Sequence, residues 1–333
     1  MRGYVVACVF LTQLGTVLSQ SCSVDGFEFD GLAHYLVGEP YLPGSIYADC
    51  VQGKATCYRD DGVMDAVNAQ VSCDEVHVKN QTHHRQLGIT LKPVAAWPQR
   101  IVCVSGVDIF PNHTRKHLAN AFREFAHKAD IMFIDVNKCP SMFGKKTEVC
   151  NNCRQFVRMT RTKPGCQSTW GYSSSRQLSV NLPQSCADYK TVLHQLGHVV
   201  GLAHEHSHPH RQVIVLRENV VAGYTNAYKI LGRSYQPFIY DPMSIMHYDN
   251  SYGALCIPLD LKLKYCDLTQ TEADGCVVPT KKHCNPSYDL AFGRSTKLMP
   301  SDVATIMKLY AKEKSYAQSR SLRGSDVKQL WES

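Results

Sequence analysis

Three histidines and a glycine in one short segment have the types and spacing of a metal site. The segment reads H-Q-L-G-H-V-V-G-L-A-H and begins at His194. On a helix, positions i and i+4 lie on one face, so His194 and His198 can direct their imidazoles to one point. Gly201 permits a left-handed helix exit that can bring His204 back to the pair. Three neutral imidazoles with an open fourth position are typical of a catalytic zinc site, and we expect one Zn²⁺ per chain. The alternative is surface and core histidines that bind no metal.

These side chains need a helix and a surrounding fold to position them. Asp188 can cap a helix that runs to about Val200. Residues 114–128 have an amphipathic pattern that predicts a second helix, and residues 302–310 predict a third. Strands are expected in the short apolar stretches at residues 131–136, 156–159 and 178–182.

A second motif lies downstream and makes the chain resemble a known family. Ser244 begins the run S-I-M-H-Y, which includes Met246. The histidine pattern followed by a methionine turn resembles the metzincin metallopeptidases. Glu205 directly after the third histidine, together with S-I-M-H-Y, looks like the astacin family within them. The resemblance covers about residues 95–310, and it includes Leu298-Met299-Pro300-Ser301-Asp302, which is similar to the start of the family's C-terminal helix.

The resemblance implies an α+β fold with two lobes, a long zinc helix and a zinc cleft between the lobes. It implies that Met246 forms a hydrophobic floor under the metal and that Tyr248 reaches the zinc or the transition-state oxyanion. Glu205 would anchor a new N-terminus after removal of a pro-segment. A packed core tyrosine and a surface carboxylate are the alternatives for Tyr248 and Glu205. The resemblance also implies a disulfide between Cys166 and Cys186, and the zinc ligands His194, His198 and His204.

The chain departs from the family at the position of the general base. The family's motif has glutamate where this chain has Gln195. Zinc lowers the pKa of its water, but a base must still take the proton and pass it to the leaving amine. A carboxamide is not basic near pH 7, and general-base catalysis is typically worth about 10²–10⁴-fold. We therefore expect zinc to bind and proteolysis to be lost or greatly reduced. Rescue by Glu205, which follows the turn, is a less favoured alternative.

Other departures concern a pro-segment latch and additional side chains. The family silences its zinc with an aspartate in an F-x-G-D motif, and the nearest match is Phe27-Glu28-Phe29-Asp30, which makes Asp30 the candidate latch. His206, His208 and His210 could hold a second metal ion, but a polar strand with histidines on both faces is favoured. Cys150 and Cys153 are expected to form disulfides rather than a zinc site. A loop after the methionine turn is expected to be tied by Cys256, Cys266, Cys276 and Cys284.

Cysteine usage and the N-terminus predict a secreted protein. The chain has 333 residues, of which 15 are cysteine and 15 are histidine. We interpret residues 1–19 as a signal peptide, with a membrane anchor as the alternative that polar residues within it disfavour. Its removal takes away Cys8 and leaves fourteen cysteines, an even number that suits full pairing. Sequons at Asn80 and Asn112 predict glycosylation.

The composition and charge argue against two classes of partner, nucleic acids and membranes. Charged residues make up 20% of the chain and the formal charge is +7, with no basic stretch interleaved with aromatics, which argues against nucleic-acid binding. No later segment is long and apolar enough to span a membrane. The domain plan has residues 20–86 as a cysteine-containing pro-segment and linker, 87–311 as the peptidase-like domain, and 312–333 as a polar tail.

Three functions remain open at this point. The favoured one is a secreted, zinc-binding, astacin-like protein with little or no proteolysis, whose cleft takes a peptide or protein as substrate or ligand. The second is an active zinc endopeptidase that uses another base. The third is a non-enzymatic metal-binding or adhesion module.

Overall fold

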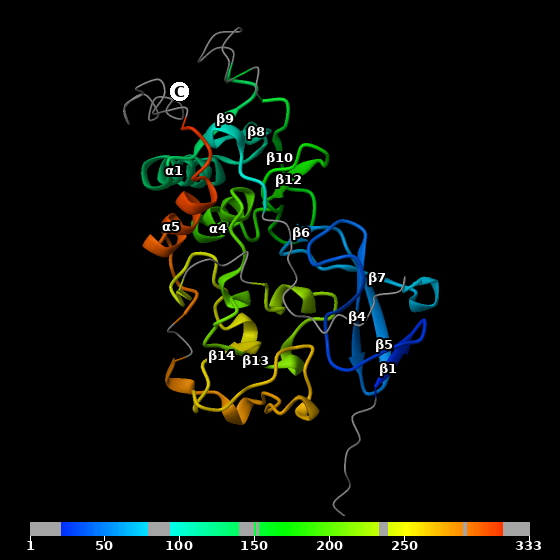
Figure 1. The fold of residues 1–333 in the computed structure, drawn as a ribbon. Helices are drawn as coiled ribbons and strands as arrows, with labels where there is room; N and C mark the ends of the chain where they lie inside the picture. The colour runs from blue at the N-terminus through cyan, green and yellow to red at the C-terminus, as the bar shows by residue number, and fades with distance from the viewer. Residues whose placement is uncertain are drawn as a thin grey trace, which may run out of the picture.

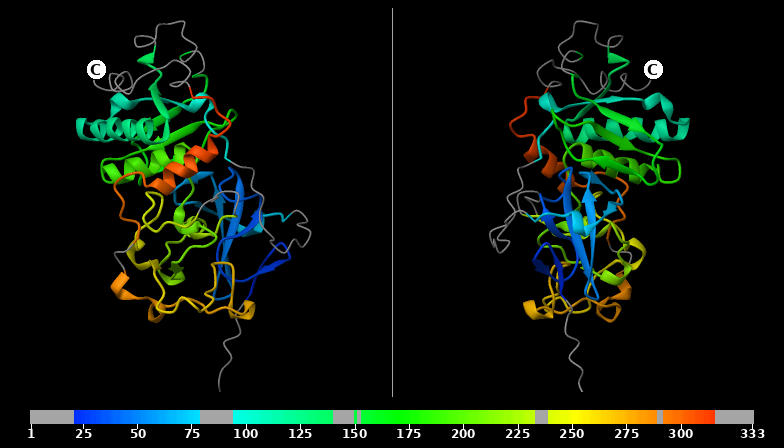
Figure 2. Two further views of the ribbon diagram at one scale, coloured as in Figure 1. Left: turned by 60° about the vertical axis from the view of Figure 1, so that its left-hand side comes forward. Right: turned by 90° about the vertical axis from the view of Figure 1, so that its right-hand side faces the viewer.

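The described part of the chain forms three units. The computed structural model describes residues 21–78, 94–139, 150, 153–232, 239–288 and 292–315. We call residues 21–78 the N-terminal unit, the described residues of 94–200 the sheet lobe, and those of 201–315 the C-terminal lobe. Figures 1 and 2 show the N-terminal unit lying along the junction between the two lobes. The expected signal peptide, Cys8, Asn80 and most of the polar tail lie outside the described residues.

The sheet lobe is built on a six-stranded sheet, and one of its two edge strands, β6, comes from the N-terminal unit. Its order is β6-β11-β12-β10-β8-β9. Strands β12, β10, β8 and β9 are parallel neighbours, whereas β11 is antiparallel to both β12 and β6. The strands are β6 (Val63–Met64), β8 (Ile101–Ser105), β9 (Met132–Asp135), β10 (Val157–Thr160), β11 (Gln167–Thr169) and β12 (Leu178–Asn181).

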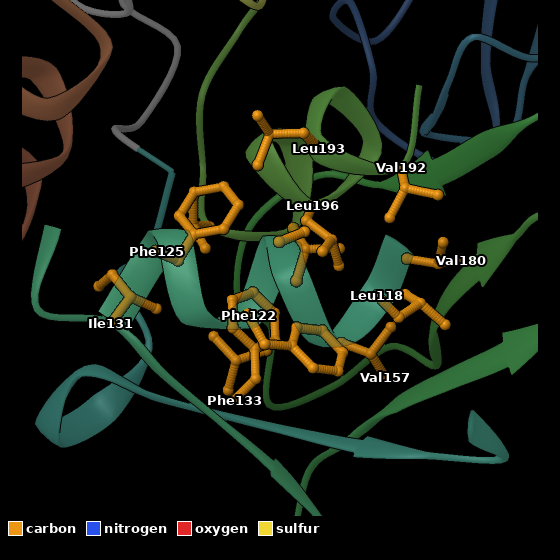
Figure 3. Packing of buried hydrophobic residues seen from close by; sticks show 14 of the residues in the cluster. Leu118, Phe122, Phe125, Ile131, Phe133, Val157, Val180, Val192, Leu193 and Leu196 are labelled. Atoms are coloured by element: carbon orange, nitrogen blue, oxygen red, sulfur yellow. The ribbon is translucent and has the colours of Figure 1, made fainter. Parts of the chain in front are cut away.

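Two helices cover one face of this sheet and enclose the main core. They are α1 (Asn112–Ala129) and α4 (Tyr189–Val199). Leu118, Phe122 and Phe125 of α1 meet the α4 residues and the inward side chains of the strands, as Figure 3 shows. Phe122 stacks on Phe133 of β9 with ring centroids 4.6 Å apart. The helical spacing of apolar residues in 112–129 therefore buries α1 on the side that supports α4.

The opposite face of the sheet is covered by a smaller cluster that contains disulfides. Alternate residues of β8 and β9, such as Ile101 and Ile134, point to this side. Cys103 pairs with Cys153 and Cys139 pairs with Cys150, so the two cysteines of the C-x-x-C motif join different partners. The expectation that this motif is disulfide-bonded is thus confirmed.

The N-terminal unit is a small disulfide-tied β structure. Four antiparallel strands have the order β3-β4-β5-β7, and a separate β1-β2 hairpin packs beside them. The bounds are β1 (Cys22–Val24), β2 (Phe27–Phe29), β3 (His34–Val37), β4 (Ser45–Val51), β5 (Lys54–Asp60) and β7 (Ala69–Val71). Disulfides join Cys22 to Cys50 and Cys57 to Cys73. These bonds hold a unit too short to build a large core of its own.

The C-terminal lobe has little regular structure. It contains the strand pair β13 (Ile214–Val215) and β14 (Leu255–Cys256), several 3₁₀ turns and the final helix α5 (Pro300–Leu309). Cys256 pairs with Cys284 and Cys266 with Cys276, as expected for a tied loop after the methionine turn. Among the described residues, no helix has the length and apolar character to cross a membrane.

A buried carboxylate lies where the N-terminal unit meets the C-terminal lobe. Asp49 of β4 is 4% exposed and accepts hydrogen bonds from the Ala33 amide at 2.8 Å and from the Thr225 hydroxyl at 2.9 Å. Burial raises the pKa of Asp49 to about 6, although these hydrogen bonds lower it. The folded protein therefore binds a proton between about pH 4 and pH 6 that the unfolded chain does not.

We predict that Asp49→Asn stabilises the protein at neutral pH and flattens its pH dependence. Because the folded pKa is raised, the contribution of Asp49 is favourable at low pH and is lost as the pH rises through about 6. The variant should gain about 2 kcal/mol in free energy of unfolding near pH 7 and little near pH 4, measured by urea denaturation. Asp61→Asn, at an exposed position, is the control. An unchanged pH slope in Asp49→Asn would contradict the assignment.

Candidate metal centre

Helix α4 presents the first two histidines on one side, as the i, i+4 spacing requires. The Asp188 side chain caps the helix by accepting from the Thr191 amide at 3.0 Å. The Nδ1 atom of His194 lies 2.9 Å from the Ile245 carbonyl, and Nδ1 of His198 lies 2.9 Å from the Leu202 carbonyl. These contacts fix both rings so that the Nε2 atoms point to the same place.

A turn at Gly201 brings the third histidine to the same place. Gly201 has a φ of +106°, which glycine tolerates and other residues rarely adopt. The Nε2 atom of His204 then lies 3.1 Å from Nε2 of His198, which in turn lies 3.1 Å from Nε2 of His194. The structure therefore brings together the three histidines that the sequence singled out.

An aspartate from the N-terminal unit completes the cluster. Asp65 directly follows β6 and has a left-handed backbone with φ of 61°. Its Oδ2 atom lies 3.2 Å from Nε2 of both His194 and His198, and its Oδ1 lies 2.8 Å from Nε2 of His204. The side chain of Asp65 is 7% exposed. Among the described residues, this is the one group of three or more His, Cys, Asp or Glu side chains suited to a metal ion.

The spacing of the four donors fits a tetrahedral zinc ion. Zinc binds imidazole nitrogen at about 2.0–2.1 Å, so the donor atoms of a tetrahedral site lie about 3.3 Å apart. The separations are 3.2 Å from Asp65 Oδ2 to His194 and His198, 2.8 Å from Oδ1 to His204, and 3.1 Å from Nε2 of His198 to Nε2 of the other two histidines, all close to that value. Three imidazoles and one carboxylate leave no open position in a four-coordinate site, which is the arrangement of a structural rather than a catalytic zinc.

Burial of the histidines, and the contacts of Asp65 with them, favour the protonation states that a metal requires. Desolvation lowers the pKa of His198, and it lowers the pKa of His204 to about 4, which favours neutral imidazoles. Burial on its own raises the pKa of Asp65, but its interactions with His204 and His194 outweigh this and hold the pKa well below the ordinary value. A cation at the centre would act in the same direction on all of these groups.

Gln195 lies beside the cluster and binds the same aspartate. The residue is 2% exposed, and its Nε2 donates to Asp65 Oδ2 at 2.6 Å. The Oε1 atom is buried and has no hydrogen-bond partner among the described residues. An ionised carboxylate can only accept, so the carboxamide must present its NH₂ group to Asp65. A glutamate carboxylate here would face a second carboxylate, and one of the two would have to bind a proton.

The methionine turn supports the cluster from below. Met246 is buried, and its sulfur packs against Gly197 of α4, where a larger residue would not fit. The turn is held by Asp302 of α5, which accepts from the Ser244 hydroxyl at 2.5 Å and from the Ile245 amide at 3.1 Å. Helix α5 therefore positions the floor of the site through one carboxylate.

Tyr248 points into the site from the same turn. Its hydroxyl donates to Asp65, and its ring lies 4.6 Å from the ring of His204, measured between centroids. Burial, with the nearby charge of Asp65, raises the pKa of Tyr248 well above the ordinary value. The phenol is therefore a neutral donor at the edge of the metal cluster.

Glu205 points away from the metal. Its carboxylate accepts from the Asp241 amide at 2.9 Å and lines a small cavity together with Asp302. Burial raises the pKa of Glu205 to about 8, and repulsion from Asp302 and Asp241 adds to the effect. Among the described residues, no cation forms an ion pair with Glu205. This placement argues against Glu205 as a substitute for the general base.

The remaining histidines of the segment have other partners. Nε2 of His206 lies 2.9 Å from the Ala227 carbonyl, and Nδ1 of His208 accepts from the His210 amide at 2.9 Å. Within the part of the chain that the structure describes, these three histidines belong to no group suited to a second metal ion. The strand expected here is wrong, because residues 205–207 form a 3₁₀ turn and His206 and His208 are buried. The absence of a second metal stays a prediction.

The sequence motif predicted the wrong aspartate as the pro-segment residue that lies against the zinc ligands. The motif match selected Asp30, but the structure puts Asp65 against the histidines, while Asp30 lies before β3 and interacts with His34 through its backbone. Asp65 ends the run G-V-M-D, which has glycine and methionine at the positions where the expected motif has phenylalanine and glycine. The one local signal is an aspartate directly after a two-residue apolar stretch.

A cavity opens beside the cluster on the side of the Cys166–Cys186 disulfide. Its volume is about 480 Å³, and its lining includes His194, Gln195 and Tyr248. Val67 of the N-terminal unit also forms part of its wall. The docked N-terminal unit therefore covers the metal centre with Asp65 and leaves this neighbouring cavity open.

Comparison with known proteins agrees with this geometry. The sequence profile of the Astacin peptidase family matches residues 90–256. The chain belongs to the astacin family. The α+β astacin-like fold expected from the histidine and methionine-turn motifs is thereby confirmed. The match begins after the N-terminal unit, so Asp65 comes from outside the matched residues.

Individual astacin relatives cover parts of the chain. Bone morphogenetic protein 1 homolog from Strongylocentrotus purpuratus is 27% identical over 196 residues, which are 55% of this chain and 29% of that protein. Astacin-like metalloprotease toxin 4 from Loxosceles laeta is 38% identical over 84 residues, 23% of this chain and 68% of that protein. A solved structure of High choriolytic enzyme 1, a hatching enzyme zinc-protease from Oryzias latipes, aligns with 66% of this chain and 94% of that one, at 16% identity and a TM-score of 0.45. The chain thus spans less than a third of the length of the first of these relatives.

We predict that Gly201→Ala destabilises the protein more than Gly44→Ala does. Both glycines have positive φ, but an added Cβ at Gly201 would lie 2.6 Å from Leu309 Cδ2, whereas at Gly44 nothing lies within 4 Å. Backbone strain alone costs about 1 kcal/mol, and the clash at the zinc-helix exit should bring the loss to about 2–3 kcal/mol. Urea denaturation measures both, and equal losses would contradict the role of this contact.

We also predict that Asp65→Ala opens one position on the metal. Cobalt(II) bound to the native protein should have four protein donors, and added azide should leave its visible spectrum unchanged. In Asp65→Ala the three histidines still bind cobalt, and azide should shift the spectrum. Asp61→Ala, four residues away and exposed, should behave as the native protein does. A spectral response of the native protein to azide would contradict fourfold protein coordination.

Proposed function

We propose that this chain is a secreted zinc-binding member of the astacin family in which the docked N-terminal unit covers the metal centre and part of the cleft, and in which proteolysis is lost or greatly reduced. The observation that carries the proposal is the 2.6 Å hydrogen bond from Gln195 to Asp65. The residue at the general-base position is a neutral donor, and its donor group is already engaged by the carboxylate that occupies the fourth position around the histidines.

The surrounding residues support the loss of base catalysis. A zinc ion bound by the three histidines would supply Lewis acidity and lower the pKa of a bound water. Proton transfer to the leaving amine needs a group that accepts a proton near pH 7, and Gln195 does not. Asp65 has a lowered pKa and stands where that water would bind, and Glu205 faces the cavity beside Asp302. Tyr248, with a raised pKa, would serve as a donor only.

The strand pairing supports a closed cleft. Without β6, strand β11 would be an exposed sheet edge, which is the usual docking place for an extended peptide. Here β6 pairs antiparallel with β11, with Met64 opposite Ser168 and Val63 opposite Thr169. The N-terminal unit therefore uses the backbone positions that a peptide ligand would need.

Secretion and ligand binding are part of the same proposal. Seven disulfides among the described residues suit an oxidising compartment, and the sequon residue Asn112 is exposed at the start of α1. The 480 Å³ cavity beside His194 is the place where a peptide side chain of a ligand would enter. The second candidate, an active endopeptidase with another base, has no carboxylate in support, because Glu205 and Asp65 are both committed elsewhere.

The test compares four forms of the zinc-loaded protein in a peptide-hydrolysis assay. We expect no cleavage by the native chain, and none by Asp65→Ala, which still lacks a base. Gln195→Glu restores a carboxylate but places it against Asp65, so we expect little gain. Asp65→Ala combined with Gln195→Glu supplies both a base and an open position, and it should give the highest rate of the four.

Metal analysis of each form controls for loss of zinc, and urea denaturation controls for unfolding. Zinc-dependent cleavage by the native chain at a rate equal to that of the double variant would overturn the proposal.

A further inference from the structure

The β-sheet of the N-terminal unit has two buried faces, and only one of them is covered by the unit itself. Side chains alternate along its strands. Leu36 and Ala48 point to the β1-β2 hairpin and the disulfides, where they form the unit's own core. Tyr35, Tyr47 and Tyr58 point the other way, and each is at most 6% exposed. An isolated unit would expose this second face to water.

The C-terminal lobe covers that second face and shares a core with it. One hydrophobic cluster contains residues of both units, and its C-terminal members are almost fully buried. Leu268 is 1% exposed and Leu255 and Phe292 are 0% exposed. The members from the C-terminal lobe are Val213, Val215, Ala227, Tyr228, Ala254, Leu255, Leu268 and Phe292. Apart from α5, the described part of this lobe has one two-residue strand pair and short turns, so its core is incomplete without the tyrosine face of the sheet.

Polar groups inside the shared core are also matched across the boundary. The Thr225 hydroxyl donates to Asp49, and the Lys229 ammonium, 4% exposed, donates to the Ala33 carbonyl at 3.1 Å. The Leu32 amide donates to the Leu268 carbonyl at 2.9 Å. Removing the unit would leave these groups without their partners, and a buried polar group without a partner destabilises the structure that contains it.

A second shared cluster lies closer to the metal centre. Tyr41 of the N-terminal unit packs edge-on against Trp170, with ring centroids 5.6 Å apart, and Met64 joins the same cluster. The Tyr41 hydroxyl donates to the Asn226 carbonyl at 3.1 Å. The contact thus extends from the sheet lobe to the C-terminal lobe. Interfaces of this apolar type, which resemble a divided domain core, are those of obligate complexes.

We propose that the N-terminal unit is a permanent part of the folded protein. It stays bound to the two lobes after the connecting segment is cut and after the metal is removed. Each of the seven disulfides lies within one side of this boundary, so retention after a cut would be entirely non-covalent. The partner that fits the apolar face of the C-terminal lobe is therefore the chain's own residues 21–78. This inference does not rest on loss of proteolysis, since it concerns the shared core and not Gln195.

The test uses the full chain with a recognition sequence for a specific protease placed between Val78 and Val94. After complete cleavage, size-exclusion chromatography in EDTA should give one peak that contains both fragments. Separation of the N-terminal fragment in EDTA without denaturant would overturn the proposal. Peptide hydrolysis is not part of this readout, so its outcome and that of the proposed function are independent.

Matched variants separate the shared core from the metal latch. Leu32→Asp places a charge in the shared core and should release the fragment, whereas Val51→Asp, at a position 57% exposed in the same unit, should not. Asp65→Ala should also retain the fragment. Release by Asp65→Ala alone would assign the docking to the metal cluster and overturn the proposal.

A milder variant keeps the test decisive if Leu32→Asp does not fold. Thr225→Val removes one donor to Asp49 and preserves the shape of the side chain. It should lower the urea concentration at which the cut fragment dissociates, with Thr191→Val, whose hydroxyl donates to Asp188 on the exposed start of α4, as the control. Equal dissociation midpoints for the native chain and Thr225→Val would count against the shared core as the source of docking.

Discussion

The contact between the Asp65 carboxylate and three imidazoles is the interaction on which the arrangement of the molecule depends. It brings together groups more than 120 residues apart in the sequence, and all of them are buried. A carboxylate in such a place is stable only if donors or a cation compensate its charge. Gln195 and Tyr248 donate to it, and the histidines complete its surroundings. The same atoms therefore close the cleft and complete the metal cluster.

Because of this contact, a glutamine at position 195 affects both the chemistry of the site and the binding of Asp65. A glutamate there would provide the base for hydrolysis, but it would repel Asp65. A glutamine removes the base and supplies a donor that binds Asp65. Under the proposed function, loss of the catalytic group and stabilisation of the closed state both follow from this one residue. The shared hydrophobic core acts in the same direction, because it joins the N-terminal unit, which carries β6 and Asp65, to the C-terminal lobe.

The sequence predicted the elements whose signals are local. The i, i+4 histidines, the glycine exit and the Asp188 cap together define the metal-binding helix, and the structure has that helix at Tyr189–Val199. The loop cysteines after the methionine turn likewise pair with one another. The family resemblance supplied the fold and the Cys166–Cys186 pair, which alternation and spacing alone did not determine.

The features that sequence reasoning missed depend on distant contacts. Asp65 stands in a segment rich in aspartates, and the two apolar residues before it are too weak a signal to select it over Asp30 or Asp61. Its role follows from the pairing of β6 with β11, which closes a long loop. The tyrosine face of β3, β4 and β5 reads in the sequence as ordinary strand alternation. Only the packing shows that it belongs to a core shared with residues 213–292.

The central claim is that Asp65 fills the fourth position of the metal site in the intact chain. The most direct measurement is a crystal structure of the zinc-loaded full-length protein, with the metal located by its anomalous scattering. The account predicts one zinc bound by His194, His198, His204 and a carboxylate oxygen of Asp65, with the Gln195 amide bonded to the same carboxylate. A zinc ion with a water in the fourth position and Asp65 turned away would contradict it.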